Sequence, residues 1–170
     1  SPGNRTPRKS TLPAIGSGTE PIWRFAAGLP GRTAFIRVVR EGVRCARANF
    51  CTLDARGLVA DRRAGRIATE VCEDLCAILS KRIKKIGGTE VIIRAGKEHR
   101  FVVLFRGKSL EGPLTDSDPN REGLPIATVK PTNAKSAKQK KAAKLVADLY
   151  KAALPLLKGR RPANGFLMRG

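Results

Sequence analysis

The sequence predicts an α+β fold in which a mixed sheet of about four to six short strands carries two long amphipathic helices on one face. The chain has 170 residues, of which 41% are hydrophobic and 28% charged, so it can bury one core. Two segments have helical periodicity, and several short ones are rich in β-favouring residues. Two helices among so many strands cannot connect each strand pair by its own crossover, which disfavours a doubly wound sheet.

The first half of this domain predicts strands and one helix. Strand-like segments span 34–39 and 43–53, and a turn ending at Gly57 leads into the short apolar run 58–59, which together indicate a hairpin. A helix is expected over 69–86, with Thr69 as its cap and Gly87 and Gly88 after its end. Apolar residues recur at every fourth position of this segment, namely Val71, Leu75, Leu79 and Ile83.

The second half predicts two central strands, a long loop and a second helix. The strands cover 89–94 and 99–106, and the loop covers 107–132, a length at which loops are often functional. The second helix is expected over 133–154, ended or kinked by Pro155. The C-terminal residues predict a final short strand.

Residues 1–30 have a different composition from the domain predicted over 31–170. They are rich in Pro, Gly and Ser without hydrophobic periodicity, and Arg5, Arg8 and Lys9 have no acidic neighbour before Glu20. This composition is typical of a basic extended arm that cannot order itself by burying apolar surface.

Overall charge and residue counts limit the chemistry. The net charge is +20 and the sequence pI about 10.9, which favours polyanionic partners. The single histidine, His99, excludes a multi-histidine metal centre within the chain. The four cysteines lack zinc-site spacing, so we expect buried thiols in a reducing compartment, either cytoplasm or an organellar matrix. No apolar run approaches the roughly 18 to 20 residues of a membrane-spanning helix, and no membrane partner is expected.

Three short clusters combine arginines with acids in turns or at strand ends. Guanidinium groups close to free backbone N–H groups can bind phosphate or carboxylate. Taken alone, a basic turn is more often a solvated face than an anion site, and a single histidine beside Glu and Arg is more often structural than catalytic. The clusters are Asp61, Arg62, Arg63 and Arg66; Glu98, His99 and Arg100 with Arg106 at the end of the same strand; and Asp116 with Asp118.

The order of these motifs is more specific than any one of them. RANFCTLD at 47–54, DRRAGRI at 61–67, EHRFVVLFRG at 98–107, DSDP at 116–119, PAN at 162–164 and the final RG follow one another along the chain. In order and spacing they resemble the inserted domain of the archaeal-type, cofactor-independent phosphoglycerate mutases over about residues 44–170. Residues 1–43 match that pattern poorly.

This resemblance implies a division of labour between two parts of an enzyme. In that family a separate core supplies two divalent metal ions, manganese being expected, and a transiently phosphorylated serine, while the inserted domain covers the cleft and grips phosphoglycerate. The resemblance therefore implies no cofactor in this segment, and no activity without the core. By position, Arg62, Arg63 and Arg66 would grip the anion, Arg100 and Arg106 would support them, and Asp61, Glu98 and Asp118 would orient the guanidinium groups.

The expected second helix suggests an alternative function. Residues 130–161 contain ten basic residues and one acidic residue. With the basic arm, such a surface suits RNA, and it favours a repurposed mutase-like domain within a ribonucleoprotein such as a ribosome, next to other subunits. A merely solvated helix face would have the same composition. The residues that would contact phosphates are Arg5, Arg8, Lys9, Lys135, Lys138, Lys140, Lys141 and Lys144.

Overall fold

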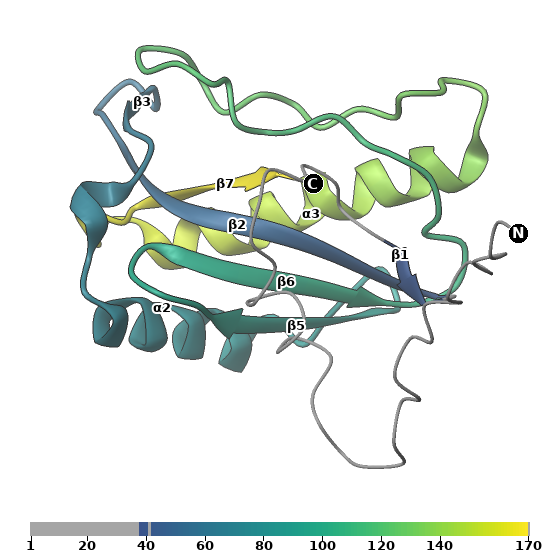
Figure 1. The fold of residues 1–170 in the computed structure, drawn as a ribbon, viewed down its shortest axis with the longest axis horizontal. Helices are drawn as coiled ribbons and strands as arrows, with labels where there is room; N and C mark the ends of the chain where they lie inside the picture. The colour runs from purple at the N-terminus through teal and green to yellow at the C-terminus, as the bar shows by residue number, and fades with distance from the viewer. Residues whose placement is uncertain (1–37, 41, 170) are drawn as a thin grey trace, which may run out of the picture.

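The computed structural model describes residues 38–40 and 42–169, drawn in colour in Figure 1. The predicted arm and the strand-like segment up to residue 37 lie outside the described residues. Within the described part of the chain, no helix is long and apolar enough to cross a membrane.

A single antiparallel sheet forms the centre of the domain (Figure 1). Its strands are β1 (Val38–Arg40), β2 (Val43–Leu53), β3 (Val59–Asp61), β4 (Lys85–Ile86), β5 (Thr89–Ala95), β6 (Arg100–Arg106) and β7 (Gly165–Arg169). They run in the order β1-β2-β6-β5-β4, and β3 and β7 also pair with β2. The α+β class is confirmed, but every described pairing is antiparallel, so the expectation of a mixed sheet was wrong. Tight turns join β2 to β3, β4 to β5 and β5 to β6, and each reverses the chain direction.

Both long helices pack on one face of this sheet, as predicted. One buried cluster joins Ala48 and Phe50 of β2 to Leu79 of α2 (Thr69–Arg82) and to Val146 and Leu149 of α3 (Ala137–Leu157). A short 3-10 helix, η1 (Ala64–Arg66), precedes α2. Because alternate residues of a strand point to opposite faces, β2 contributes its even-numbered residues to this core.

The helix ends differ in detail from the prediction. Helix α2 ends at Arg82, and Lys85 and Ile86 instead form β4 beside β5. Helix α3 begins after Ser136, whose hydroxyl caps the backbone N–H of Gln139 at 3.3 Å. It continues past Pro155 to Leu157, a fully buried residue that anchors its last turn in the core.

The long loop 107–132 is held against other parts of the domain by backbone hydrogen bonds. Ser117 donates to Met168 of β7 at 2.9 Å, and Val59 of β3 donates to Leu124 at 2.9 Å. A small second cluster, Cys51, Val59 and Leu167, packs on Ile126 of this loop. The loop thereby brings residues 117–120 next to β7. All four cysteines are buried and free, as expected.

Candidate anion-binding site

The turn between β3 and α2 places three arginines within five residues. The carboxylate of Asp61 accepts hydrogen bonds from the backbone N–H groups of Arg63 at 2.7 Å and Gly65 at 2.6 Å. Ala64, Gly65 and Arg66 then have φ values of 48°, 63° and 54°. Left-handed backbone at a non-glycine residue is strained, and such strain collects at functional sites. Asp61 therefore shapes the turn, whereas its position had predicted that it would orient a guanidinium.

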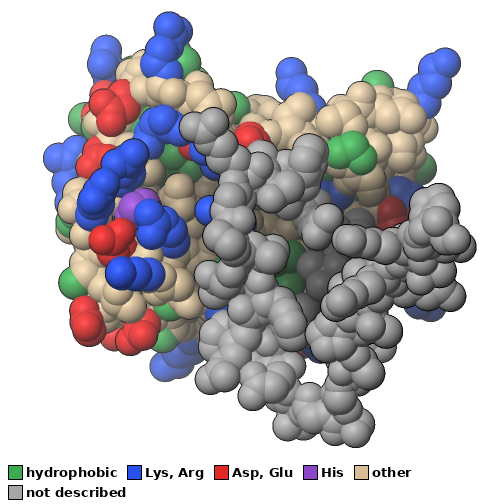
Figure 2. All heavy atoms as spheres, in the orientation of Figure 1, with side chains coloured by type: hydrophobic (Ala, Val, Ile, Leu, Met, Phe, Trp, Pro, Cys, Tyr) green, Lys and Arg blue, Asp and Glu red, His purple; other side chains and the backbone are tan. Residues whose placement is uncertain are grey.

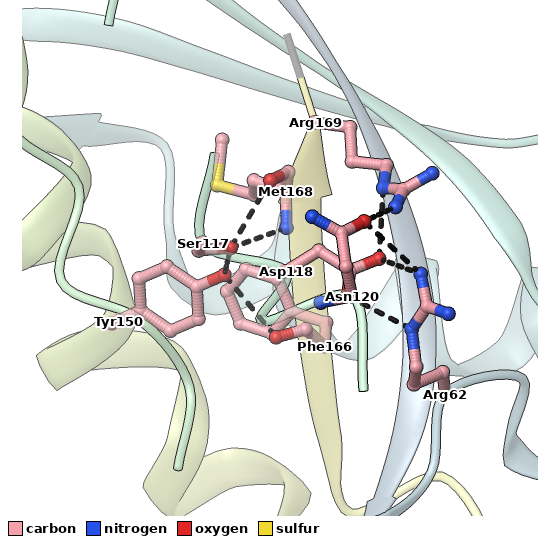
Figure 3. A network of polar contacts seen from close by, with 8 residues as sticks. All are labelled: Arg62, Ser117, Asp118, Asn120, Tyr150, Phe166, Met168 and Arg169. Atoms are coloured by element: carbon pink, nitrogen blue, oxygen red, sulfur yellow. Dashed lines mark hydrogen bonds and ion pairs between the residues drawn. The ribbon is translucent and has the colours of Figure 1, made fainter. Parts of the chain in front are cut away.

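Arg62 forms a two-pronged ion pair with Asp118, a buried aspartate in the long loop (Figure 3). Arg62 donates from Nε to Oδ1 at 2.9 Å and from Nη2 to Oδ2 at 2.8 Å. Arg169, the last described residue of β7, lies on the other side with Nε 2.8 Å from the same Oδ2. The Asn120 amide oxygen accepts from both guanidinium groups. Asp118 thus pairs with both Arg62 and Arg169.

The Asp118 carboxyl stays ionised in this setting. Only 1% of its side chain is exposed, while 31% of Arg62 and 41% of Arg169 remain exposed. Burial alone would raise the pKa of Asp118, but the hydrogen bonds from Arg62 and from the Asn120 backbone and the charges of Arg169 and Arg62 outweigh it and lower the pKa. One carboxylate thus fixes two guanidinium groups that still present edges to solvent.

A buried hydroxyl network holds the Asp118 segment in place (Figure 3). The Ser117 hydroxyl lies 2.7 Å from the Tyr150 hydroxyl and accepts from the Met168 backbone N–H at 2.6 Å. Tyr150 donates to the Phe166 carbonyl at 3.2 Å, and the two rings stack with centroids 4.3 Å apart. Burial of Tyr150 raises its pKa, so the phenol stays protonated. Helix α3 and β7 are thereby joined to the residue preceding Asp118.

A second group of charges surrounds His99, which directly precedes β6. Figure 2 shows the histidine among Lys and Arg side chains with acidic groups beside them. His99 is 3% exposed, and burial followed by the charge of Arg100 lowers its pKa, with smaller contributions from Arg63 and Arg66. Glu98 acts in the opposite direction. The imidazole is therefore neutral at pH 7, and its buried Nδ1 has no hydrogen-bond partner among the described residues.

Glu98 and Arg100 are fixed by the turn that enters β6. Glu98 has a φ of 57°, and its backbone N–H donates to the Thr69 hydroxyl at the start of α2 at 3.1 Å. Its carboxylate forms an ion pair with the Arg100 guanidinium at 3.6 Å. Thr69 therefore secures this turn instead of capping α2, for which no side-chain cap is present.

Arg106 is the predicted site residue that the fold separates from the others. It lies at the opposite end of β6 from Arg100, about 20 Å away for a seven-residue strand. Its guanidinium donates to Glu90 of β5 at 3.0 Å. We therefore leave Arg106 out of the site.

The lysines considered for RNA binding are exposed on or just before α3. Lys138 pairs with Glu111 at 3.3 Å, Lys144 pairs with Asp148 at 2.6 Å, and Lys141 donates to the Lys108 carbonyl at 2.8 Å. Lys135 and Lys140 are exposed as well. Arg5, Arg8 and Lys9 lie outside the described residues.

Several residues of the site were not assigned a role from the sequence. Arg169 reaches Asp118 only because β7 pairs with β2 in one register, which local sequence does not specify. Asn120 lies two residues after Asp118, and its backbone N–H donates to the Asp118 carboxylate at 2.8 Å. Ser117 and Tyr150 are 33 positions apart and meet through the packing of α3. The DSDP motif was the available signal for this segment.

Metal binding requires several convergent ligands. Among the residues that the structure describes, no group of three or more His, Cys, Asp and Glu side chains is placed to hold a metal ion. The two metals that the resemblance implies belong to a separate core, so the residues described here are expected to bind anions without a metal of their own.

Comparison with protein families identifies the fold. The profile described as 2,3-bisphosphoglycerate-independent phosphoglycerate mutase matches residues 37–163, about three quarters of the chain. The chain belongs to this family. The match begins at residue 37, before the segment of about 44–170 that carries the motifs, and it covers the arginine turn, the Asp118 loop and both helices.

Individual relatives agree with this assignment. A probable 2,3-bisphosphoglycerate-independent phosphoglycerate mutase of Thermotoga sp. (strain RQ2) is 45% identical over 125 residues, covering 74% of this chain and 30% of the relative. One from Thermus thermophilus is 41% identical over 131 residues, covering 77% of this chain and 32% of the relative. The cofactor-independent phosphoglycerate mutase structure from Thermoplasma acidophilum superposes with a TM-score of 0.66 at 31% identity, covering 77% of this chain and 36% of that one. The chain therefore spans about a third of these relatives.

Proposed function

We propose that this domain binds phosphoglycerate as the substrate-gripping part of a cofactor-independent phosphoglycerate mutase. The observation that carries the proposal is that Arg63, Arg66 and Arg100 lie close enough to the buried, neutral His99 for their charges to lower its pKa. A guanidinium binds phosphate or carboxylate through two parallel hydrogen bonds and cannot lose its proton at neutral pH, so it holds an anion without acting as an acid. Strained turns at residues 64–66 and at Glu98 preorganise these side chains.

Family membership supports the ligand class. A mutase must keep hold of a three-carbon acid while its phosphate leaves one hydroxyl and joins another, and fixed cations suit that task. The arginine turn lies within the segment that matches the family, and Arg62, Arg63 and Arg66 all belong to it. Asp118, in the same segment, orients Arg62.

Calorimetric titration of the 170-residue chain with 3-phosphoglycerate tests the proposal. We expect Arg63→Ala, Arg66→Ala and Arg100→Ala each to weaken binding by about 1 to 3 kcal/mol, the usual loss for a charge-assisted hydrogen bond. Arg62→Ala should weaken it by a similar amount and also lower stability, because Asp118 loses a partner. Arg106→Ala is the matched control, on the same strand but at its other end, and should change affinity less than about twofold. Equal affinities in all variants would contradict the proposal.

We expect these 170 residues to have no mutase turnover on their own, with manganese or any other divalent ion. The chain has a single histidine, and the resemblance assigns the metal ligands and the phosphorylated serine to the core. Adding metal to the purified chain and assaying conversion of 3-phosphoglycerate tests this. Metal-dependent turnover by the isolated chain would overturn it.

RNA binding is a second candidate, favoured by the exposed lysines of α3. This surface is basic apart from Asp148, but Lys138, Lys141 and Lys144 already contact groups of the chain itself. If the five lysines contact phosphates, replacing all of them by Gln should lower the salt dependence of RNA binding, by roughly 0.7 to 0.9 in log-log slope for each contact. Filter binding measures that slope, and an unchanged slope would make this helix a solvated face. The variant carries Lys135→Gln, Lys138→Gln, Lys140→Gln, Lys141→Gln and Lys144→Gln.

A further inference from the structure

The outer face of helix α2 is exposed from its first turn to its last. Four exposed residues follow one another along this face at intervals of four, three and four positions, so they form one row on the helix surface. The row consists of Glu70, Asp74, Ala77 and Lys81. The opposite side of the helix, with Leu75 and Leu79, is buried in the core. The row is therefore a surface against which another molecule can pack.

Acidic and basic side chains are separated along this face. Glu70, Glu73 and Asp74 are exposed in the first half of α2, and Lys81 and Arg82 are exposed at its end. Figure 2 shows acidic side chains over the start of α2, at the lower left of the view. Asp74 and Lys81 are about 10 Å apart along the axis, too far to pair within the helix. None of the five forms an ion pair or a side-chain hydrogen bond with another described residue.

The helix macrodipole accounts for only part of this arrangement. It stabilises acids in the first turn and bases in the last, which covers Glu70, Lys81 and Arg82. Glu73 and Asp74 lie in the second turn, beyond the range of this effect. Asp74 also follows Glu70 by four positions, a spacing at which like charges destabilise a helix. Two acids therefore remain that do not stabilise the isolated helix.

We infer that α2 is a contact surface for a second copy of this chain, with the two α2 helices packed antiparallel. A two-fold axis just after Ala77 places Asp74 opposite Lys81 of the second copy. The same axis places Glu73 opposite Arg82, and symmetry repeats both pairs. At the centre of the contact, the small side chain of Ala77 lets the helix axes approach to about 8 Å. Parallel packing would instead place acid against acid.

Charge complementarity favours a second copy over other partners. The acids repel a polyanion and the bases repel a polycation, whereas the same helix in reverse direction has the opposite sign at each position. The net charge of +20 opposes association at long range, but salt at 0.15 M screens charges beyond about 8 Å. A 14-residue helix is about 21 Å long and covers less than a standard interface, so the dimer is weak and reversible. This inference does not depend on the proposed function.

Sedimentation equilibrium of the nuclease-treated 170-residue chain tests the dimer. At physiological salt and up to about 1 mM protein, we expect a reversible monomer–dimer equilibrium. Glu73→Lys with Asp74→Lys makes the helix face entirely basic, and Lys81→Glu with Arg82→Glu makes it entirely acidic. Each double variant should self-associate at least about tenfold more weakly, because attractive pairs become repulsive. An equimolar mixture of the two should form a heterodimer at least as tight as the parent dimer.

A neutral substitution tests the centre of the contact without changing charge. Ala77→Gln adds a larger side chain that keeps good helix propensity, and it should weaken the dimer about fivefold or more. Ala147→Gln is the matched control, at an exposed alanine of α3, and should change the dimer less than about twofold. Circular dichroism checks that all variants keep their helices. If the charge-reversed variants lose theirs, the comparison of Ala77→Gln with Ala147→Gln decides.

Each outcome either supports or overturns the α2 contact. Heterodimer formation by the mixed variants, or selective loss of the dimer in Ala77→Gln, supports it. A parent chain that stays monomeric up to about 1 mM overturns it. A parent dimer that Ala77→Gln and Ala147→Gln affect equally uses another surface and also overturns it. None of these measurements involves phosphoglycerate or RNA, so failure here leaves the proposed function standing.

Discussion

Two regions of this domain are strongly basic, and their construction differs. Around Asp118, two arginines share a carboxylate that is 1% exposed. On α3, Lys144 and Lys151 share Asp148, which is 29% exposed, and the lysine side chains are 76% and 80% exposed. Both arrangements place two cations on one acid. Only the first fixes where the cations lie, because buried charge-assisted hydrogen bonds tolerate little motion, whereas exposed pairs are screened by water.

Backbone geometry shows the same contrast. The described residues include five non-glycine positions with positive φ, and four of them, Ala64, Arg66, Glu98 and Asn120, belong to the arginine region. The lysines of α3 lie on or just before a regular helix whose residues need no special backbone. Charge density alone therefore does not mark the binding site. The candidate site lies where strained backbone holds charged side chains in fixed positions.

The largest expected effect is the difference in stability lost when each of the two shared carboxylates, Asp118 and Asp148, is replaced by an amide. Asp118→Asn should lower the free energy of unfolding by about 2 to 3 kcal/mol at pH 7, because two partly buried guanidinium groups lose their counter-charge. Asp148→Asn, the matched change on α3, should cost less than about 0.5 kcal/mol. Urea denaturation of both variants measures the difference. Similar losses in the two would mean that the two regions are energetically alike.

The pH dependence of stability gives a second test of the Asp118 charge. The native pKa of Asp118 is lowered, so its contribution is present above the ordinary aspartate pKa of about 4 and is lost as the pH falls through the lowered native value. The gap between the parent and Asp118→Asn should therefore narrow below about pH 4. A gap that stays constant down to pH 3 would show that the Asp118 charge is not what stabilises the fold.

Much of the fold could be predicted from the sequence because its signals are local. The four-residue recurrence of Val71, Leu75, Leu79 and Ile83 located α2, and the apolar run at 101–105 located β6. Strand direction was not encoded in this way, since it depends on which turns and crossovers the chain uses. The end of α2 was placed four residues too late because β5 recruits Lys85 and Ile86 as a pairing strand.

Residues of the candidate site that lie within one short motif could be located from the sequence. Residues that meet only when strands pair in one register could not. The arginine turn lies within one motif that the resemblance had aligned. Asp118 was expected to orient a guanidinium group, but the sequence did not name Arg62 as its partner. Arg106 was wrongly grouped with Arg100. The two residues are only six positions apart, but an extended strand places them at opposite ends of β6. Arg169 was passed over because its position depends on the β2–β7 register.

An intermediate loss of stability is expected when the hydroxyl network of Ser117 and Tyr150, next to Asp118, is disrupted. Tyr150→Phe removes the contacts with Ser117 and the Phe166 carbonyl but keeps the ring stack, so it should destabilise the domain by about 1 to 2 kcal/mol. Ser117→Ala should cost a similar amount, and the double variant less than the sum, since the two hydroxyls are partners. Thermal or urea unfolding measures all three. Fully additive losses would show that the two residues act independently of each other.

The smallest expected effect belongs to His99 and concerns how the arginine region responds to pH. Burial and the charges of Arg100, Arg63 and Arg66 lower the pKa of His99, so in the free domain the imidazole takes up its proton below the ordinary histidine pKa of about 6.5. A bound anion offsets those positive charges and favours the imidazolium form, so anion affinity should rise as the pH falls. Sulfate keeps its charge throughout this range, which makes it the suitable probe, and its affinity should increase as the pH is lowered from 7.5 to 5.5. His99→Gln should bind sulfate with no such increase, and an equal rise in both proteins would locate the titrating group elsewhere.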